Sequence, residues 1–181
     1  MELTSQVIKW IESDSYRMEA LVLASKLGLD DWCLAAGFVR NLIWDKLHSK
    51  STLTPLNDID LIYFDGNTIA EDSDVRYEEK LKSLSDHPWS VKNQARMHIR
   101  NNDQPYFSTS DAMSYWVEVE TAVGATYSED FGVSIVAPFG LEANFSNSIT
   151  LNSKRPKPSD FRKRVTEKEW PILWPNLEVI S

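Results

Sequence analysis

The chain has 181 residues, a formal net charge of −8 and a single cysteine. This length suits one domain, and a lone cysteine excludes a disulfide within the chain and favours a reducing compartment. This negative net charge disfavours sequence-independent binding to duplex nucleic acid. Because the N-terminus does not resemble a signal peptide and no apolar run approaches the roughly 20 residues of a membrane span, we expect a cytoplasmic monomer without membrane contact.

Apolar spacing predicts helices that alternate with strands. A helical pattern covers residues 4–27, with a break near Ser13 or Asp14, either of which can cap the second helix. A strand at 32–36 ends at Gly37, and a helix follows at 38–48. Next we expect strands at 58–64, 89–99, 121–127 and 132–137, helices at 75–84, 110–116 and 159–169, a helical turn at 140–146 and a linker at 153–158. This alternation predicts an α+β or α/β fold with a central sheet.

Two aspartates open the predicted strand in the stretch PLNDIDLIYFD. Side chains at i and i+2 of a strand share a face, so Asp58 and Asp60 can converge on one divalent cation or on two that share a site. Oxygen ligands at a strand edge favour Mg²⁺ or Mn²⁺ over zinc. The alternative is an ordinary turn, because Asn-Asp before a strand is common turn chemistry.

A possible anion site precedes this strand in the stretch AAGFVRN. Here a strand, a glycine and a helix start follow one another, and a helix N-terminus binds anions through its free N–H groups and its dipole. Arg40 is unfavourable for the dipole in a first turn, so it indicates either a phosphate or a partner such as Asp58 or Asp60. Alternatively, Gly37 only permits a tight corner.

The predicted strand at 89–99 alternates in polarity. Its polar face comprises Ser90, Lys92, Gln94, Arg96, His98 and Arg100. Such a row of side chains is costly to bury without partners, so the face meets either a triphosphate or water. Arg96 and His98 together suit a phosphate or the edge of a base.

Two further groups of charges remain open to two interpretations. Glu118 and Glu120 flank Val119 before a predicted strand, as in a solvated turn. Positive charge is concentrated at Lys154, Arg155, Lys157, Arg162, Lys163, Arg164 and Lys168. These cations form either a solvated face or a rim for an RNA or nucleotide acceptor.

The order strand, glycine, helix with Arg-Asn, loop and Asp-x-Asp strand resembles the nucleotidyltransferase superfamily, which includes DNA polymerase β and the CCA-adding enzymes. The CCA-adding branch has stretches similar to AAGFVRNLIWDKL, NDIDL and TAVGATYSEDFGVSIVAPFGLEANF. The pieces VKNQARMH, APFGL and the final WP are similar to a small bacterial nucleotidyltransferase-like family. The resemblance implies a single domain at 1–181, with a core at 32–145, N-terminal helices at 4–27 and a basic helix and tail at 153–181.

The resemblance also implies a fold and a site. The fold is a mixed sheet of about five strands with helices mainly on one face. Asp58 and Asp60 bind Mg²⁺ or Mn²⁺ and act in catalysis, where His98 is a further candidate. Nucleotide contacts fall on Gly37, Phe38, Arg40, Asn41, Lys92 and Arg96. A nucleoside triphosphate then gives its nucleotidyl group to a hydroxyl of an RNA, a small molecule or a protein, with release of pyrophosphate.

The sequence departs from the superfamily pattern in two places. Ala36 and Phe38 flank Gly37, where the motif usually has a second glycine or serine. The strand at 89–99 carries no acid for the usual third carboxylate, so the base is Glu118, Glu120 or His98, or transfer does not occur. The alternatives are a catalytically silent module that binds a nucleotide or a partner, and a phosphoesterase that uses the same two aspartates.

Overall fold

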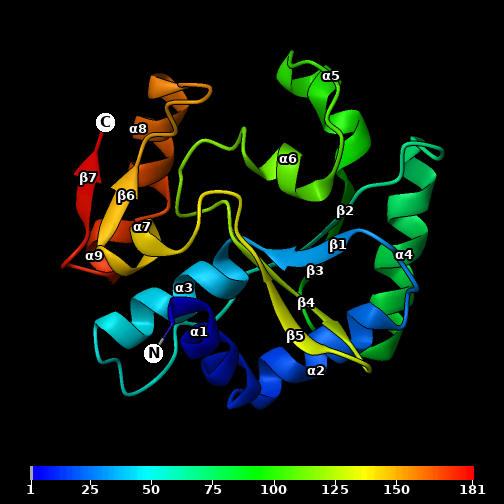
Figure 1. The fold of residues 1–181 in the computed structure, drawn as a ribbon, viewed down its shortest axis with the longest axis horizontal. Coiled ribbons are helices and arrows are strands. Elements are labelled where there is room, and N and C mark those ends of the chain that lie inside the picture. The colour runs from blue at the N-terminus through cyan, green and yellow to red at the C-terminus, as the bar shows by residue number, and fades with distance from the viewer. Residues whose placement is uncertain (1) are drawn as a thin grey trace.

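The computed structural model describes residues 2–181, and its centre is a five-stranded mixed sheet in the order β3-β2-β1-β4-β5 (Figure 1). The strands are β1 (Trp32–Ala35), β2 (Ile59–Tyr63), β3 (Trp89–Asn93), β4 (Gly124–Ser128) and β5 (Gly132–Val136). β2 and β3 run parallel, whereas the other neighbours are antiparallel. This sheet confirms the predicted α+β class.

Four helices cover one face of this sheet. They are α1 (Leu3–Glu12), α2 (Ser15–Ser25), α3 (Gly37–Leu47) and α4 (Glu71–Leu84). Ile59, Leu61 and Tyr63 of β2 point into the core between the sheet and these helices. Residues of opposite parity, Asp60 and Ile62, therefore lie on the other face. This alternation, predicted from the sequence, places the aspartates away from the main core.

The break in the N-terminal helical segment falls where the sequence predicts it. The carboxylate of Asp14 accepts hydrogen bonds from the N–H groups of Tyr16 at 3.1 Å and Arg17 at 3.3 Å. An aspartate at the N-cap satisfies N–H groups that have no partner inside the helix. α2 therefore begins as a separate helix.

The prediction of one long strand at 89–99 is wrong in its second half. β3 ends at Asn93, and the chain continues as a 3₁₀ turn η1 (Gln94–Arg96) and a helix α5 (Met97–Asn101). The fully buried side chain of Asn93 accepts from the N–H of Ala95 at 3.0 Å and donates to the carbonyl oxygen of Asp65 at 2.9 Å. These bonds cap the turn, so the polar residue on the apolar side marked the end of the strand.

The C-terminal third forms a second, smaller core around Trp44 of α3. Its elements are β6 (Ser148–Thr150), α8 (Pro158–Glu167), α9 (Trp170–Leu173) and β7 (Glu178–Ile180). Two further short helices pack elsewhere: α6 (Thr109–Met113) places Met113 beside Cys33 and Ile62, and α7 (Glu142–Phe145) places Phe145 against the main core. β6 and β7, which the sequence analysis did not predict, pair in parallel. Buried around Trp44 are Ile149, Phe161, Trp170, Trp174 and Leu177. The C-terminal tail, drawn orange to red in Figure 1, thus packs beside α3.

Across residues 2–181, no helix combines the length and apolar character that crossing a membrane requires.

Candidate active site

Two carboxylates stand at the start of β2. Asp58 is exposed and directly precedes the strand, whereas Asp60 lies within it and is only partly accessible. In the sheet register, Asp60 pairs with Ala35 of β1 and with Ser90 of β3. The two-residue spacing directs both carboxylates to the same face.

The environment of Asp60 disfavours its charge. Burial raises the pKa of Asp60 to about 6, the negative charge of Asp58 adds to this rise, and a hydrogen bond from Ser90 opposes it. Neither aspartate forms an ion pair with any residue in the range 2–181. Two neighbouring carboxylates without a cationic partner gain stability from a bound cation.

The backbone at the start of α3 is strained. Ala36 has φ 55° and ψ −120°, a conformation that favours glycine. Its N–H donates to the carbonyl oxygen of Val123 at 2.8 Å, and its own carbonyl oxygen accepts from the N–H of Arg40 at 2.9 Å. The N–H groups of Gly37 and Phe38 form no hydrogen bond within residues 2–181. They are therefore available to an anion.

Gly37 leaves room for the side chain of the next turn. A Cβ at this position would lie 3.2 Å from Nδ2 of Asn41 and 3.5 Å from an Nη of Arg40. The absence of a side chain thus lets Asn41 and Arg40 fold back over the start of the helix.

Arg40 is buried and held by neutral groups. Its Nη1 donates to Thr121 Oγ1 at 2.8 Å, and its Nη2 donates to Asn41 Oδ1 at 3.0 Å. The guanidinium lies over the rings of Trp44 and Trp170, at 5.0 Å and 4.6 Å from their centroids. Burial lowers the pKa of Arg40 to about 10. It forms no ion pair within residues 2–181. Of the two roles that the sequence left open for Arg40, pairing with Asp58 or Asp60 is therefore absent, and contact with a phosphate stays a prediction.

These groups meet in a cavity of about 270 Å³, here called the α3 cavity. Its lining includes Gly37, Arg40, Asn41, Asp58, Asp60 and Lys168. The structure thus brings together both predicted metal ligands and three of the predicted nucleotide contacts. It adds Lys168 from the end of α8.

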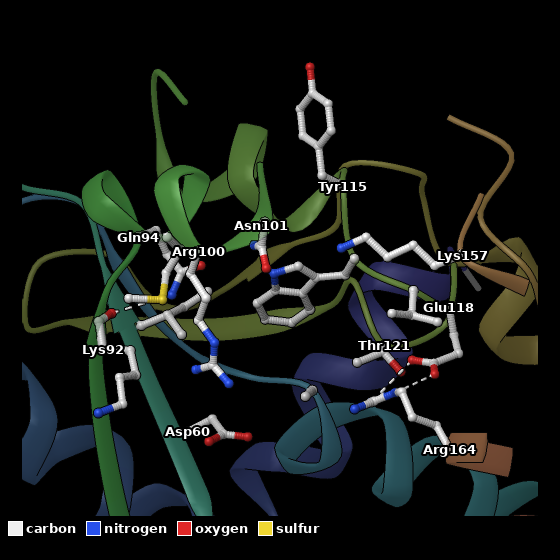
Figure 2. A pocket seen from close by; sticks show the side chains of 15 residues that line it. Asp60, Lys92, Gln94, Arg100, Asn101, Tyr115, Glu118, Thr121, Lys157 and Arg164 are labelled. Atoms are coloured by element: carbon white, nitrogen blue, oxygen red, sulfur yellow. Dashed lines mark hydrogen bonds and ion pairs between the residues drawn. The ribbon is translucent and has the colours of Figure 1, made fainter. Parts of the chain in front are cut away.

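A second cavity, of about 400 Å³, adjoins the first at Asp60 and is here called the α5 cavity (Figure 2). Asp60, Ala36 and Arg164 line both cavities. Lys92 of β3 lines the α5 cavity, as do Gln94, Arg100, Trp116 and Lys157. Of these, Trp116, which follows the short α6 helix, was not predicted as a site residue from the sequence.

Three predicted residues lie elsewhere. The Phe38 side chain is buried in the main core, so only its N–H reaches the site. Arg96 forms ion pairs with Asp74 and Glu71 and lines neither cavity. His98 also lines neither, and its Nδ1 lies 2.9 Å from the carbonyl oxygen of Ala95. The helical turn after Asn93 removes the shared face that linked these residues to Lys92.

Glu118 and Glu120 are both buried, so their interpretation as a solvated turn is wrong. Arg164 donates to the two carboxylate oxygens of Glu118 at 2.6 Å and 3.2 Å. Glu120 accepts from Ser148 Oγ at 2.8 Å and from the N–H of Thr150 at 2.8 Å. Glu118 lines the α5 cavity, whereas Glu120 ties β6 to the preceding segment.

Comparisons with known proteins identify the family and the fold. A family model described as nucleotidyltransferase matches residues 23–179. An NMR structure said to reveal a CCA-adding enzyme head domain matches with a TM-score of 0.82 and 30% identity, over 99% of this chain and 96% of that one.

A structure of a CCA-adding enzyme in complex with CTP has the same fold, with a TM-score of 0.58 and 13% identity. The match covers 100% of this chain but 44% of that longer one. No curated protein sequence matches the chain.

Proposed function

Because the chain belongs to the nucleotidyltransferase family, we propose that it transfers a nucleotidyl group from a nucleoside triphosphate to a hydroxyl acceptor with the help of Mg²⁺ or Mn²⁺. Pyrophosphate is the second product. The observation that carries this proposal is the α3 cavity, where Asp58 and Asp60 face a helix N-terminus and two cations without carboxylate partners. A cavity with this composition suits a metal-bound polyphosphate.

The two aspartates fit a divalent cation of this kind. No group of three or more His, Cys, Asp or Glu side chains suited to a metal occurs within residues 2–181. Mg²⁺ is usually held by one or two carboxylates together with substrate phosphates, and this is the donor set that Asp58 and Asp60 offer. When bound, the cation neutralises phosphate charge and activates the attacking hydroxyl.

The remaining groups of the α3 cavity bind and orient the phosphates. The free N–H groups of Gly37 and Phe38 can donate to phosphate oxygens, and Lys168 supplies a positive charge in the lining of the same cavity. Arg40, fixed between two tryptophan rings, is oriented before the ligand arrives. The structurally similar CCA-adding enzyme was solved with CTP, which supports a nucleoside triphosphate as the ligand.

A catalytically silent binding module is the second candidate, and the surroundings of Asp60 favour it. Its neighbour on β3 is Ser90, which supplies no carboxylate. Glu118 is held by Arg164, and Glu120 is held by residues of β6. Such a module binds the nucleotide but releases no pyrophosphate with any acceptor.

Titration of isotope-labelled protein with Mg²⁺ and a non-hydrolysable triphosphate analogue tests the site. We expect amide shifts at Gly37–Asn41 and Asp58–Asp60 in the native protein, and their loss in Asp58→Asn and Asp60→Asn because each variant removes a metal ligand. Asp130→Asn is the matched control, since this exposed residue lies in the turn between β4 and β5.

Unchanged binding in both site variants would show that the aspartates do not hold the metal. Pyrophosphate release from natural triphosphates, measured on the same proteins with a panel of acceptors, then separates the enzyme from the silent module.

A further inference from the structure

The α5 cavity contains cations that the protein itself does not neutralise. The side chains of Lys92, Arg100 and Lys157 form no ion pair or hydrogen bond within residues 2–181. By contrast, the neighbouring Lys154 and Arg155 pair with Asp111 and Asp103. Three basic side chains without a partner thus line the cavity, which therefore suits an anion.

Lys157 gives this argument its strongest support. Its side chain is partly buried, and burial followed by the charge of Arg155 lowers its pKa. Figure 2 shows the ammonium group extending into the cavity from one wall, while Arg100 extends from the other wall toward Asp60. A partly desolvated cation directed into a cavity is stabilised by an anionic ligand there.

The rest of the lining matches a nucleotide. Trp116 offers an aromatic surface at the wall, and aromatic side chains stack on bases. The ring of Tyr115 points away from the cavity (Figure 2) and contacts Lys154 and Tyr106 instead. The amide oxygens of Gln94 and Asn101 accept no hydrogen bond from residues 2–181. Amide oxygens that are free to accept can pair with donor groups on the edge of a base. Cations, an aromatic ring and amides together distinguish a nucleotide from a bare phosphate.

The position of Asp60 assigns a role to this cavity. In phosphoryl transfer the attacking and leaving oxygens lie on opposite sides of the reacting phosphorus. The leaving pyrophosphate belongs in the α3 cavity, with the N-terminus of α3 and Lys168. Asp60 is part of the wall that both cavities share, so the attacking hydroxyl enters from the α5 cavity.

We propose that the α5 cavity is the acceptor pocket and that its acceptor is a nucleotide unit. Arg100 and Lys157 bind its phosphate, and its ribose hydroxyl faces Asp60. This proposal rests on the proposed function. The hydroxyl oxygen bonds to the α-phosphorus, the bond from that phosphorus to the bridging oxygen breaks, pyrophosphate leaves with the electron pair, and the hydroxyl proton passes to solvent.

Two kinds of molecule carry this chemistry, a free nucleotide and the 3′-terminal nucleotide of an RNA. The test uses isotope-labelled protein saturated with Mg²⁺ and a non-hydrolysable triphosphate analogue. It is then titrated either with the four ribonucleoside 5′-monophosphates or with tetraribonucleotides of uniform sequence. We expect a second set of amide shifts, at Lys92–Asn101 and Tyr115–Glu118. Tighter binding of tetranucleotides identifies an RNA end, and equal binding identifies a free nucleotide.

Variants show whether the unpaired cations carry the binding. Arg100→Gln and Lys157→Gln should each weaken the tighter probe by about tenfold, and each should lower the slope of log affinity against log salt by about one. Both should leave the affinity for the triphosphate analogue unchanged. Arg162→Gln is the matched control, because this exposed cation precedes Lys163 on α8 and lines neither cavity.

The outcomes separate this proposal from the one on which it rests. If the analogue binds at Gly37–Asn41 but neither probe shifts the α5 cavity, the acceptor assignment is wrong and the proposed function stands. If the analogue alone shifts both cavities, the α5 cavity holds the nucleoside of the triphosphate, which also overturns the assignment. If the analogue does not bind at all, both proposals fail.

Discussion

Asp60 combines burial with a nearby like charge, and its protonation is therefore linked to folding. Its pKa is raised from 3.8 to about 6 in the folded protein. A carboxyl group with a raised folded-state pKa contributes stability that is fully present below about pH 3.8 and is lost as the pH rises through about 6. At neutral pH, the ionised carboxylate of Asp60 therefore lowers the stability of the metal-free protein. Residues placed for function often lower stability in this way.

We predict that Asp60→Asn stabilises the metal-free protein at pH 7, because it removes a buried charge. The free energy of unfolding should rise by about 1–3 kcal/mol. It should also fall less steeply between pH 4 and pH 7 than in the native protein. Chemical denaturation with a chelator present measures both effects, and Asp130→Asn should change neither. A destabilised Asp60→Asn at pH 7 would show that the carboxylate has a structural partner.

Local sequence determined part of this site. The two-residue spacing of Asp58 and Asp60 placed them on one face, because side chains alternate along a strand. The same logic failed for Arg96 and His98, because Asn93 ends the strand with hydrogen bonds to Asp65, 28 positions away in the chain. The alternation of polar and apolar residues along the predicted strand at 89–99 does not reveal such a cap.

At the scale of elements, the ion pair of Glu118 and Arg164 attaches α8 to the segment before β4. Glu118 is 1% exposed at its side chain, whereas Arg164 is about one-third exposed. Arg164 also lines both cavities. This single contact therefore fixes one wall of the site, and removing one partner leaves a carboxylate buried without its counter-ion.

We predict that Arg164→Met lowers the free energy of unfolding by about 2–3 kcal/mol, because it leaves the carboxylate of Glu118 buried without a counter-ion. Adding Glu118→Gln to this variant should recover more than half of the loss, which denaturation of the single and double variants measures.

Lys163→Met is the matched control on the same helix. It removes an exposed pair with Glu167 and should change stability by less than about 1 kcal/mol. Equal losses in Arg164→Met and Lys163→Met would contradict a structural role for the buried pair.

At the scale of the molecule, the C-terminal segment completes the core under the site. Trp174 lies 5.1 Å from Trp44 between ring centroids, and its Nε1 donates to Asp45 Oδ1 at 2.8 Å. Trp170 covers Arg40 from the same cluster. The segment after residue 153, expected from sequence as a basic helix and tail, is thus packed against α3 rather than appended to it.

We predict that Trp174→Ala lowers the free energy of unfolding by about 3–5 kcal/mol, because it removes a buried side chain and leaves a cavity. Affinity for the triphosphate analogue should fall as well, because the cluster that holds Arg40 loosens. Denaturant unfolding and titration measure the two effects. Ile172→Ala, at a position 73% exposed, is the control and should leave both unchanged. Independent unfolding of the C-terminal segment would contradict a shared core.

The sequence by itself determined the features that depend on neighbours along the chain. These are the succession of the five central strands and their helices along the chain, a helix cap at Ser13 or Asp14, the helix that follows Gly37, and the shared face of Asp58 and Asp60. Periodicity and capping act within a few residues, so they can be read without a structure.

Only the tertiary structure decided which charges find partners. Glu118 meets Arg164 across 46 residues, and Trp174 meets Asp45 across 129. Lys157 and Arg100, in contrast, line a cavity. An isolated sequence shows all these residues as similar polar or aromatic positions. Long-range packing alone separates the pair of Glu118 and Arg164, which holds α8 in place, from Lys157 and Arg100, which line the α5 cavity without a partner.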